Sequence, residues 1–347
     1  MSSLLLGQSP EVSESLVSRL KVEGGADVYY GYNFNRPASG SNFVPGTGTT
    51  TLRDNAFSLN VASLGLSLSP EPVGFHVLLG VGTSLEVVHA GEPAGTGIGP
   101  EVWRLIQQAS VSYAQGPLTL EAGLYPSHIG LEVLPSQANW TYTRSWMGEL
   151  SPYYQAGLKG TWTFSTEWSA QVHLLNGWQN LGENNRGKAL GTQVAYAGER
   201  LSASFNTFVG EEGTEDNSGL RLFGDVVVSW RATEALSFAA SADVGTQRRP
   251  GQSSAFWYAA ALNARLQVAG PVALAARAEL FDDRGGLISG TVQRLVEGTL
   301  TLEVRPVDHL VLKLEARHDR SSASVFEGPA ELRPYQTLVV AGVTAFF

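Results

Sequence analysis

The stretch Val272-Ala-Leu-Ala-Ala-Arg-Ala-Glu-Leu-Phe-Asp282 decides the fold of this chain. Its apolar residues at positions 272, 274, 276, 278 and 280 alternate with a second set that includes Arg277 and Glu279. Side chains of a β-strand point alternately to its two faces, whereas helical spacing would place Arg277 and Leu280 on the same face. We therefore predict a β-strand with one apolar face and one polar face, as in a wall between lipid and water.

The same period of two recurs along most of the chain and predicts sixteen strands. Strands 56–68 and 290–305 contain phase slips, which indicate β-bulges. The predicted strands lie at approximately 21–33, 56–68, 73–88, 105–113, 118–125, 150–164, 168–177, 188–196, 201–210, 219–230, 236–246, 254–268, 272–282, 290–305, 310–319 and 335–347.

The connections between these strands test the count independently. Every even-numbered strand is followed by a short turn, such as Ser69–Pro72, and every odd-numbered strand by a longer connection, such as 34–55 or 320–334. Short periplasmic turns and long extracellular loops are typical of bacterial outer-membrane barrels. One missed strand would break this alternation. We therefore predict an all-β fold, a closed antiparallel transmembrane β-barrel of about sixteen strands over residues 21–347.

The composition excludes several other classes of protein. The 347 residues include no Cys and carry a net charge of −9. The absence of Cys excludes disulfides and thiolate metal sites, and an acidic chain without Lys/Arg blocks is unlike a nucleic-acid binder. No stretch reaches the ~18 apolar residues of a membrane-spanning helix. The run Leu4-Leu5-Leu6 is too short for a signal peptide, so we expect a mature chain whose export signal has been removed.

The two ends of the chain fit an outer-membrane location. Residues 1–20 are expected to form a periplasmic segment with a short helix at 10–20. The chain ends in Phe347, preceded at alternate positions by Ala345 and Val343. A terminal aromatic on an alternating strand resembles the signal that outer-membrane assembly machinery reads. The alternative is a soluble β-sandwich or propeller, which would also alternate; a propeller should show a blade repeat of ~40–50 residues, and the chain has none.

The central third of the chain resembles a known family. Residues 123–132 read Gly-Leu-Tyr-Pro-Ser-His-Ile-Gly-Leu-Glu, residues 139–145 read Asn-Trp-Thr-Tyr-Thr-Arg-Ser, and Leu175-Asn-Gly-Trp178 follows. With Phe281-Asp-Asp283 and the terminal Phe347, these stretches resemble the OmpL-like group of outer-membrane β-barrel porins. The resemblance covers most of the chain and implies a porin-like channel, without assigning a substrate.

The sequence contains no recognisable catalytic or cofactor-binding pattern. A GxSxG nucleophile motif is absent, and the Gly-rich stretch 91–99 lacks the Lys of a phosphate-binding loop. The histidines show no metal-ligand spacing; they are His76, His89, His128, His173, His309 and His318. We therefore expect no enzymatic activity, no metal and no cofactor.

The connection 126–149, between the fifth and sixth predicted strands, is the candidate functional element. In sixteen-stranded general porins the loop at this position folds into the lumen and narrows it. Its apolar residues, among them Ile129 and Trp146, need a surface to pack against, and the inner barrel wall would provide one. The alternative is a loop that lies over the mouth.

Charges of both signs are expected on the inner face, because each would cost a few kcal/mol in lipid near mid-membrane. The acids of connection 126–149 could face a strip of arginines across a constriction and set a transverse field. Alternatively, the charges form salt bridges that only stiffen the wall. The candidate constriction residues are Glu132, Arg144, Glu149, Arg221, Arg265, Arg277 and Arg317.

Two functions are compatible with such a barrel. The first is a passive channel of the bacterial outer membrane for small hydrophilic solutes or ions. The second is a non-conducting barrel with a role in adhesion, surface structure or assembly. The expected partners are outer-membrane lipids, the solutes and the assembly machinery, with no nucleic acid. A homo-oligomer is suggested only by analogy with general porins.

Overall fold

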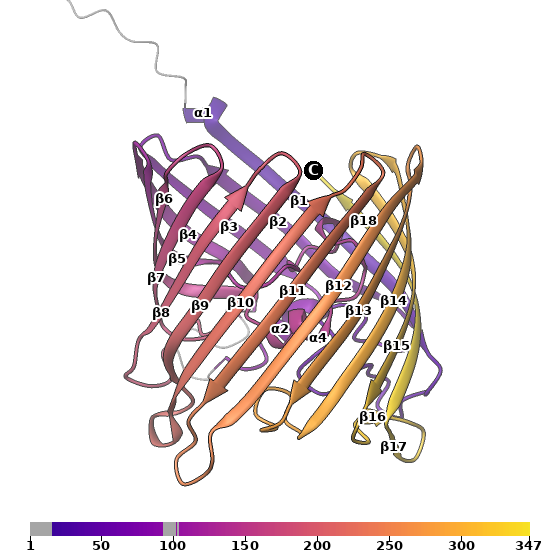
Figure 1. Ribbon diagram of the computed structural model, residues 1–347. Coiled ribbons are helices and arrows are strands. Elements are labelled where there is room, and N and C mark those ends of the chain that lie inside the picture. The colour runs from indigo at the N-terminus through magenta and orange to yellow at the C-terminus, as the bar shows by residue number, and fades with distance from the viewer. Residues whose placement is uncertain (1–15, 93–101, 103) are drawn as a thin grey trace, which may run out of the picture.

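The strands form one closed barrel. The computed structural model describes residues 16–92, 102 and 104–347. Within them, sixteen antiparallel strands join into a ring in the order β1-β18-β15-β14-β13-β12-β11-β10-β9-β8-β7-β6-β5-β4-β3-β2 (Figure 1). The first and last strands close it, with pairs from Gly25↔Phe346 to Asn33↔Leu338. A ring without a free edge satisfies every ladder N–H and C=O, as lipid requires. The predicted fold is confirmed.

Outside the barrel strands, the described residues form short elements: α1 (Leu16–Arg19) before the first strand and, in the connections, α2 (Thr83–Val88), η1 (Ser136–Ala138), α4 (Trp146–Leu150), η2 (Glu215–Asn217) and the hairpin β16 (Phe326–Glu327) with β17 (Leu332–Arg333). None of the helices in the described residues is long and apolar enough to cross a bilayer. The barrel strands are β1 (Leu20–Asn33), β2 (Ala56–Leu68), β3 (Val73–Val81), β4 (Ile106–Gln115), β5 (Leu118–Pro126), β6 (Tyr154–Thr163), β7 (Trp168–Leu175), β8 (Ala189–Ala197), β9 (Leu201–Glu212), β10 (Gly219–Arg231), β11 (Leu236–Gln247), β12 (Ala255–Ala269), β13 (Val272–Asp283), β14 (Gln293–Val307), β15 (Leu310–Ser321) and β18 (Tyr335–Phe346).

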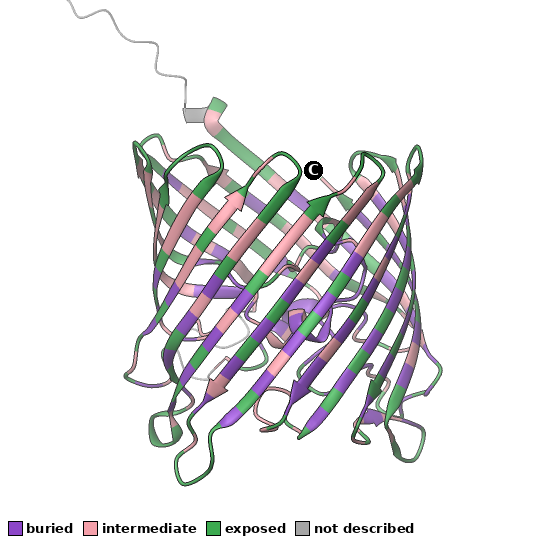
Figure 2. Cartoon of the chain, viewed as in Figure 1, coloured by how far each residue is buried: buried purple, intermediate pink, exposed green. Residues whose placement is uncertain are grey.

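Alternation of burial along the strands separates the two faces of the wall (Figure 2). On β14 every odd position from Gln293 to Glu303 is buried, and the even positions between them are exposed. On β13, Leu274 is 47% exposed whereas Ala273 is 1% exposed. The exposed positions carry the apolar side chains, so the outer face suits lipid and the polar face points inward.

Short turns lie at one rim of the barrel and long connections at the other. The short-turn rim also carries α1 and the C-terminus (Figure 1). Of the predicted N-terminal segment, residues 1–15 lie outside the described residues, and Leu16–Arg19 form α1. Both ends of the described chain therefore lie on the same side, as an even number of strands requires.

Two predicted strands are too long. The strand predicted at 73–88 ends at Val81, and residues 83–88 form α2. Gly82 interrupts the strand with a φ of 141°, where an added Cβ would lie 2.3 Å from the Asn60 carbonyl oxygen. Leu85 and Val88 are then buried on one helix face, because residues three apart are neighbours in a helix. The strand predicted at 150–164 begins only at Tyr154, after α4.

The bulge predicted in strand 56–68 is confirmed, whereas positions 293–303 of the second strand alternate without a slip. Asp27 pairs with Val61 and Val28 with Leu59, so Asn60 of β2 is the extra residue. The second shift falls between Val304 and Val307 at the end of β14. The β16–β17 hairpin in the connection 320–334 was not predicted, because strands of two residues leave no measurable period.

Adjacent residues of β7 provide a test of the two faces. Val172 is exposed on the apolar face and Gln171 is half-buried on the inner face. We expect Val172→Arg to destabilise the barrel by about 2–4 kcal/mol and Gln171→Arg by much less, because only the first places a guanidinium in hydrocarbon. Unfolding in lipid vesicles measures both variants. A larger cost for Gln171→Arg would mean that the faces are reversed.

Candidate functional site

The connection between β5 and β6 crosses the interior of the barrel. The Gly130 amide donates to Asp225 Oδ2 of β10 over 2.8 Å, and the Tyr142 hydroxyl donates to Asp27 Oδ1 of β1 over 2.9 Å. Strands β10 and β1 lie on nearly opposite sides of the ring. Helix α4 of the same connection is visible within the ring of strands (Figure 1). The segment 126–149 is therefore attached to the wall at widely separated points.

Trp146 is the main apolar anchor of this segment. Its side chain is fully buried, with the Phe43 ring edge-on at 5.9 Å and the Phe326 ring at 6.0 Å. The indole Nε1 donates to Asp319 Oδ1 over 2.8 Å. The guanidinium of Arg317 stacks on the same indole at 5.2 Å. One side chain thus joins β15 to two other connections, the first long one and the β16–β17 hairpin.

Carboxylates of the wall accept hydrogen bonds from backbone amides of the segment. Glu315 of β15 accepts from the amides of Tyr142 and Thr143 at 2.5 and 3.0 Å. Glu279 of β13 accepts from the amides of Trp146 and Met147, both at 2.6 Å. These amides lie outside regular secondary structure or in the first turn of α4, where a helix cannot satisfy them. The buried acids therefore replace a hydrogen-bond ladder.

Basic side chains of the wall donate hydrogen bonds to the carbonyl groups of the segment. Lys313 Nζ donates to the carbonyls of Ser136 at 2.9 Å and Thr141 at 3.2 Å, and also to that of Asn139. Arg305 Nη2 donates to the Gln137 carbonyl at 2.7 Å. A buried peptide group without a partner costs as much as a lost hydrogen bond. The charged inner face of β13–β15 thus compensates the irregular backbone of the segment.

Arg277 of β13 forms salt bridges with Glu132 of the segment and with Glu297 of β14. Its Nη1 lies 2.7 Å from Glu132 Oε1, and its Nε lies 3.0 Å from Glu297 Oε2 on the neighbouring strand. The Arg277 side chain is fully buried. Arg277 also donates to the Thr143 carbonyl at 2.7 Å. The sequence left open whether such charges face each other across a passage or form salt bridges. Glu132 and Arg277 form a salt bridge.

Arg144 of the segment and Arg317 of β15 are in direct contact. The Arg317 guanidinium donates to the Arg144 carbonyl and forms an ion pair with Asp319 at 2.8 Å. Arg144 itself is completely buried and donates to the carbonyls of Val133 at 2.9 Å and Tyr142 at 2.7 Å. Arg144 therefore braces the segment internally, and its charge does not reach an open passage.

Glu149 binds the first long connection. Its carboxylate accepts from the amides of Gly48 at 2.9 Å and Thr49 at 3.0 Å, and from the Thr49 hydroxyl at 2.8 Å. Burial raises the pKa of the Glu149 carboxyl, and the hydrogen bonds from Thr49 act in the opposite direction. The structure thus places Glu149 against residues 48–49, a contact that the sequence did not indicate.

The remaining two candidate arginines have separate partners. Arg265 pairs with Glu303 at 2.8 Å. Arg221 donates to Gln247 Oε1 at 2.8 Å and lies over the rings of Trp178 at 4.9 Å and Trp257 at 5.7 Å. The structure therefore brings Glu132, Arg144, Arg277 and Arg317 together, places Glu149 in α4 close enough to feel the charges of Arg144 and Arg317, and places Arg221 and Arg265 elsewhere along the wall.

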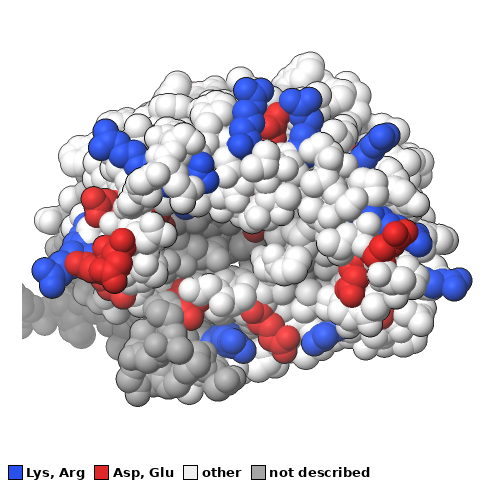
Figure 3. Space-filling model, turned by 90° about the horizontal axis from the view of Figure 1, so that it is seen from below, with Lys and Arg blue, Asp and Glu red and all other residues white. Residues whose placement is uncertain are grey.

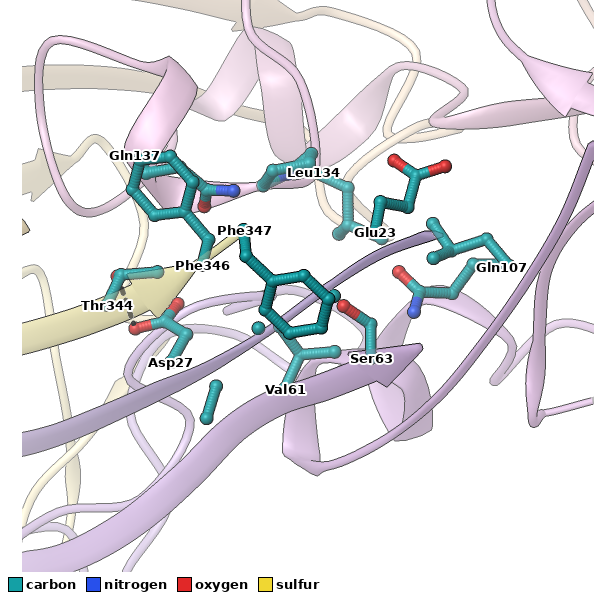
Figure 4. A pocket seen from close by; sticks show the side chains of 15 residues that line it. Glu23, Asp27, Val61, Ser63, Gln107, Leu134, Gln137, Thr344, Phe346 and Phe347 are labelled. Carbon is teal, nitrogen blue, oxygen red and sulfur yellow. Dashed lines mark hydrogen bonds between the residues drawn. The ribbon is translucent and has the colours of Figure 1, made fainter. Parts of the chain in front are cut away.

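A cavity of about 190 Å³ lies between the segment and the β1–β18 junction. Its lining includes Leu134 and Gln137 of the segment, Glu23 and Asp27 of β1, and the C-terminal Phe347 (Figure 4). At the opposite end, basic and acidic side chains are interspersed around the rim formed by the long connections (Figure 3). Both ends of the barrel therefore present polar groups.

Sequence reasoning missed Asp27 and the first long connection. Asp27 accepts hydrogen bonds from Asn60 at 2.7 Å, Ser136 at 2.6 Å and Thr344 at 3.1 Å, besides the Tyr142 hydroxyl. An acid on the polar face of the first strand was the available signal. Within the described residues, no three His, Cys, Asp or Glu side chains are grouped so as to hold a metal ion.

Comparison with known proteins identifies relatives by sequence family and by fold. Residues 19–347 match the family described as "Putative beta-barrel porin-2, OmpL-like", which confirms the resemblance seen in the sequence. No curated protein matches the sequence.

Solved porins have a similar fold at low sequence identity. The anion-selective porin from Comamonas acidovorans superposes with a TM-score of 0.65 at 13% identity, covering 94% of this chain and 99% of that one. OmpF of Salmonella typhi, in a complex with daunomycin, gives 0.62 at 11% identity, covering 94% and 97%. The outer-membrane channel DcaP of Acinetobacter baumannii gives the same four values, 0.62, 11%, 94% and 97%.

Glu279 provides a test of how the segment is held. Replacing it with Ala removes the acceptor of the Trp146 and Met147 amides, and each buried donor left without a partner costs about 1–3 kcal/mol. We expect faster hydrogen exchange in residues 142–148 of Glu279→Ala, with the barrel strands unchanged. Glu331→Ala, in an exposed connection, is the matched control. Equal protection of the segment in both variants would show that Glu279 does not hold it.

Proposed function

The chain belongs to the OmpL-like family of β-barrel porins and is an outer-membrane porin; we propose that its segment 126–149 forms the constriction through which small hydrophilic solutes or ions diffuse. One observation carries this proposal: the segment is attached to β10, β13, β15 and β1 across the interior. A chain fixed at these points must reduce the cross-section of the barrel. We also propose that the chain divides into a periplasmic segment, 1–20, and a transmembrane barrel, 21–347.

The proposed passage runs along the inner face of β4–β7. The odd positions of β14 and β15 are buried beneath the segment, whereas the inward residues Ser112, Thr119, Thr161 and Gln171 are half-buried. These side chains are small, neutral and able to hydrogen-bond. Hydrophilic solutes that exchange hydrogen bonds with such a wall pass without a large desolvation cost.

The charged side chains on this wall compensate each other. Glu121 and Lys159 form one ion pair at 2.5 Å, with side chains 16% and 18% exposed. Glu132, Arg277, Arg144 and Arg317 form the boundary of the constriction, and their charges compensate one another or bind backbone. Glu149 lies near Arg144 and Arg317, whereas Arg221 and Arg265 contribute at greater distance. We infer weak ion selectivity, because paired charges produce little net field in the passage.

The outer surface and the last strand supply the remaining partners. The apolar outer face is proposed to contact outer-membrane lipids. Strand β18 ends in Phe346, and the following Phe347 is 65% exposed. We propose that the outer-membrane assembly machinery recognises this strand. A homo-oligomer is retained as a proposal from analogy with general porins.

Removing residues 134–141 tests the constriction. We expect higher single-channel conductance in planar bilayers, because the part of the segment between its anchors is lost. Selectivity should shift toward anions, since Lys313 and Arg305 lose the carbonyls that they bind. The shift should shrink as salt rises from 0.1 to 1 M, because the Debye length falls from about 10 to about 3 Å.

The control for this deletion is removal of residues 214–217, which form an exposed turn in another connection. Conductance and reversal potential unchanged by the deletion of 134–141 would place the segment outside the permeation path. A wild-type barrel that does not conduct at all would favour the structural or adhesive alternative.

Cysteine labelling tests the orientation in the membrane. Asp216 and Ser324 are exposed in long connections, and Thr233 is exposed in a short turn. An impermeant maleimide added to intact cells should label Asp216→Cys and Ser324→Cys but not Thr233→Cys, because the short turns face the periplasm. Equal labelling of all three on unbroken cells contradicts this orientation.

A further inference from the structure

Two buried aspartates face each other across neighbouring strands of the inner wall. Asp225 of β10 and Asp243 of β11 are directly opposite in register. They are 0% and 6% exposed, so both carboxyl groups are buried at paired positions of neighbouring strands. Like charges directly opposite in a sheet repel each other. This pair therefore needs a compensating positive charge.

The surrounding residues do not provide that charge. Glu297, Glu303 and Asp319 each form an ion pair with an arginine. In the described part of the chain, neither Asp225 nor Asp243 is in an ion pair with Lys, Arg or His. Asp225 Oδ2 accepts from Gly130 and Asn206 at 2.8 and 2.7 Å.

The other oxygen of each carboxylate is left without a donor. Oδ1 of Asp225 and Oδ1 of Asp243 are buried and lack a hydrogen-bond partner among the described residues. Burying an ionised carboxylate without compensation is among the most costly arrangements in a protein interior. Neutral donors on one oxygen of Asp225 do not offset two negative charges. A cation or a proton must therefore neutralise the pair.

Oxygen-bearing side chains surround a small cavity beside Asp243. Its volume is about 10 Å³, and its lining includes Ser145, Ser151, Ser241 and Asn263. A space of this size holds one particle about as large as water. Hard divalent cations prefer such oxygen ligands, and one of them balances two carboxylates. Glu132 also lines the cavity, but its charge is already paired with Arg277.

We propose that Asp225 and Asp243 hold a divalent cation of the Ca²⁺ class, which fastens both ends of the segment to the wall. Gly130, near the start of the segment, binds Asp225, and Ser151, just after α4, lines the cavity beside Asp243. With two carboxylates and neutral oxygens as ligands, we expect a dissociation constant of about 10⁻⁴–10⁻³ M, as in weak extracellular Ca²⁺ modules. The proposal does not depend on conduction.

The test compares Asp243→Asn with Asp216→Asn, an acid-to-amide change in an exposed turn. The full chain is folded in phospholipid vesicles, and its thermal midpoint is measured in EDTA and in millimolar Ca²⁺. We expect Ca²⁺ to raise the midpoint of the wild type and of Asp216→Asn, but not of Asp243→Asn. In EDTA, Asp243→Asn should melt higher than the wild type, because one of two repelling charges is gone. Calorimetric titration with Ca²⁺ should show at least about tenfold weaker binding for Asp243→Asn.

Three results would overturn the cation site. The first is a wild-type midpoint that does not respond to Ca²⁺. The second is an equal Ca²⁺ response in Asp243→Asn. The third is stabilisation by Asp243→Asn of equal size in EDTA and in Ca²⁺, which would show that the two carboxyls share a proton. If Asp243→Asn does not fold, Asp225→Asn in the same titration must lose Ca²⁺ binding, and unchanged binding there would also overturn the proposal.

Discussion

Every backbone N–H and C=O at membrane depth must have a hydrogen-bond partner. This constraint shapes both the barrel wall and the segment 126–149 inside it. In the wall, the ladder between β1 and β18 closes the ring, so that no strand edge faces lipid. In the interior, the segment 126–149 has little regular structure of its own. Its peptide groups are satisfied instead by charged side chains of the wall, with acids taking the amides and bases taking the carbonyls.

This use of charge has a consequence for permeation. An inner wall rich in acids and bases would ordinarily suggest a strongly charged pore. Here Glu279, Glu315 and Lys313 are occupied by backbone, and Arg277 is occupied by two acids. The charges near the proposed constriction serve mainly to hold the segment 126–149 in position. The more accessible face of β4–β7 carries hydroxyl and amide groups, which supports passage of hydrophilic solutes with little charge discrimination.

Asp225 and Asp243 are the exception to this arrangement. Each of the other buried acids discussed here is bound to an arginine or to several N–H and O–H donors. In the aspartate pair, Asp225 accepts a hydrogen bond from Gly130 of the segment, but one oxygen of each carboxylate has no donor among the described residues. A cation there would complete the attachment of the segment and make it dependent on the ions around the cell.

The sequence by itself determined the barrel. Alternation in stretches such as 272–282 identified the faces, and the alternation of short and long connections fixed the number of strands, because both features are local and repeat along the chain. Only the tertiary structure decided where α2 replaces a strand, since Leu85 and Val87 fit a period of two whereas Leu85 and Val88 fit one face of a helix. It also decided the partners of Glu132, Glu149 and Asp243. Those contacts join residues far apart in sequence. They depend on the register of the closed strands and on the path of an irregular segment, and no local pattern encodes either.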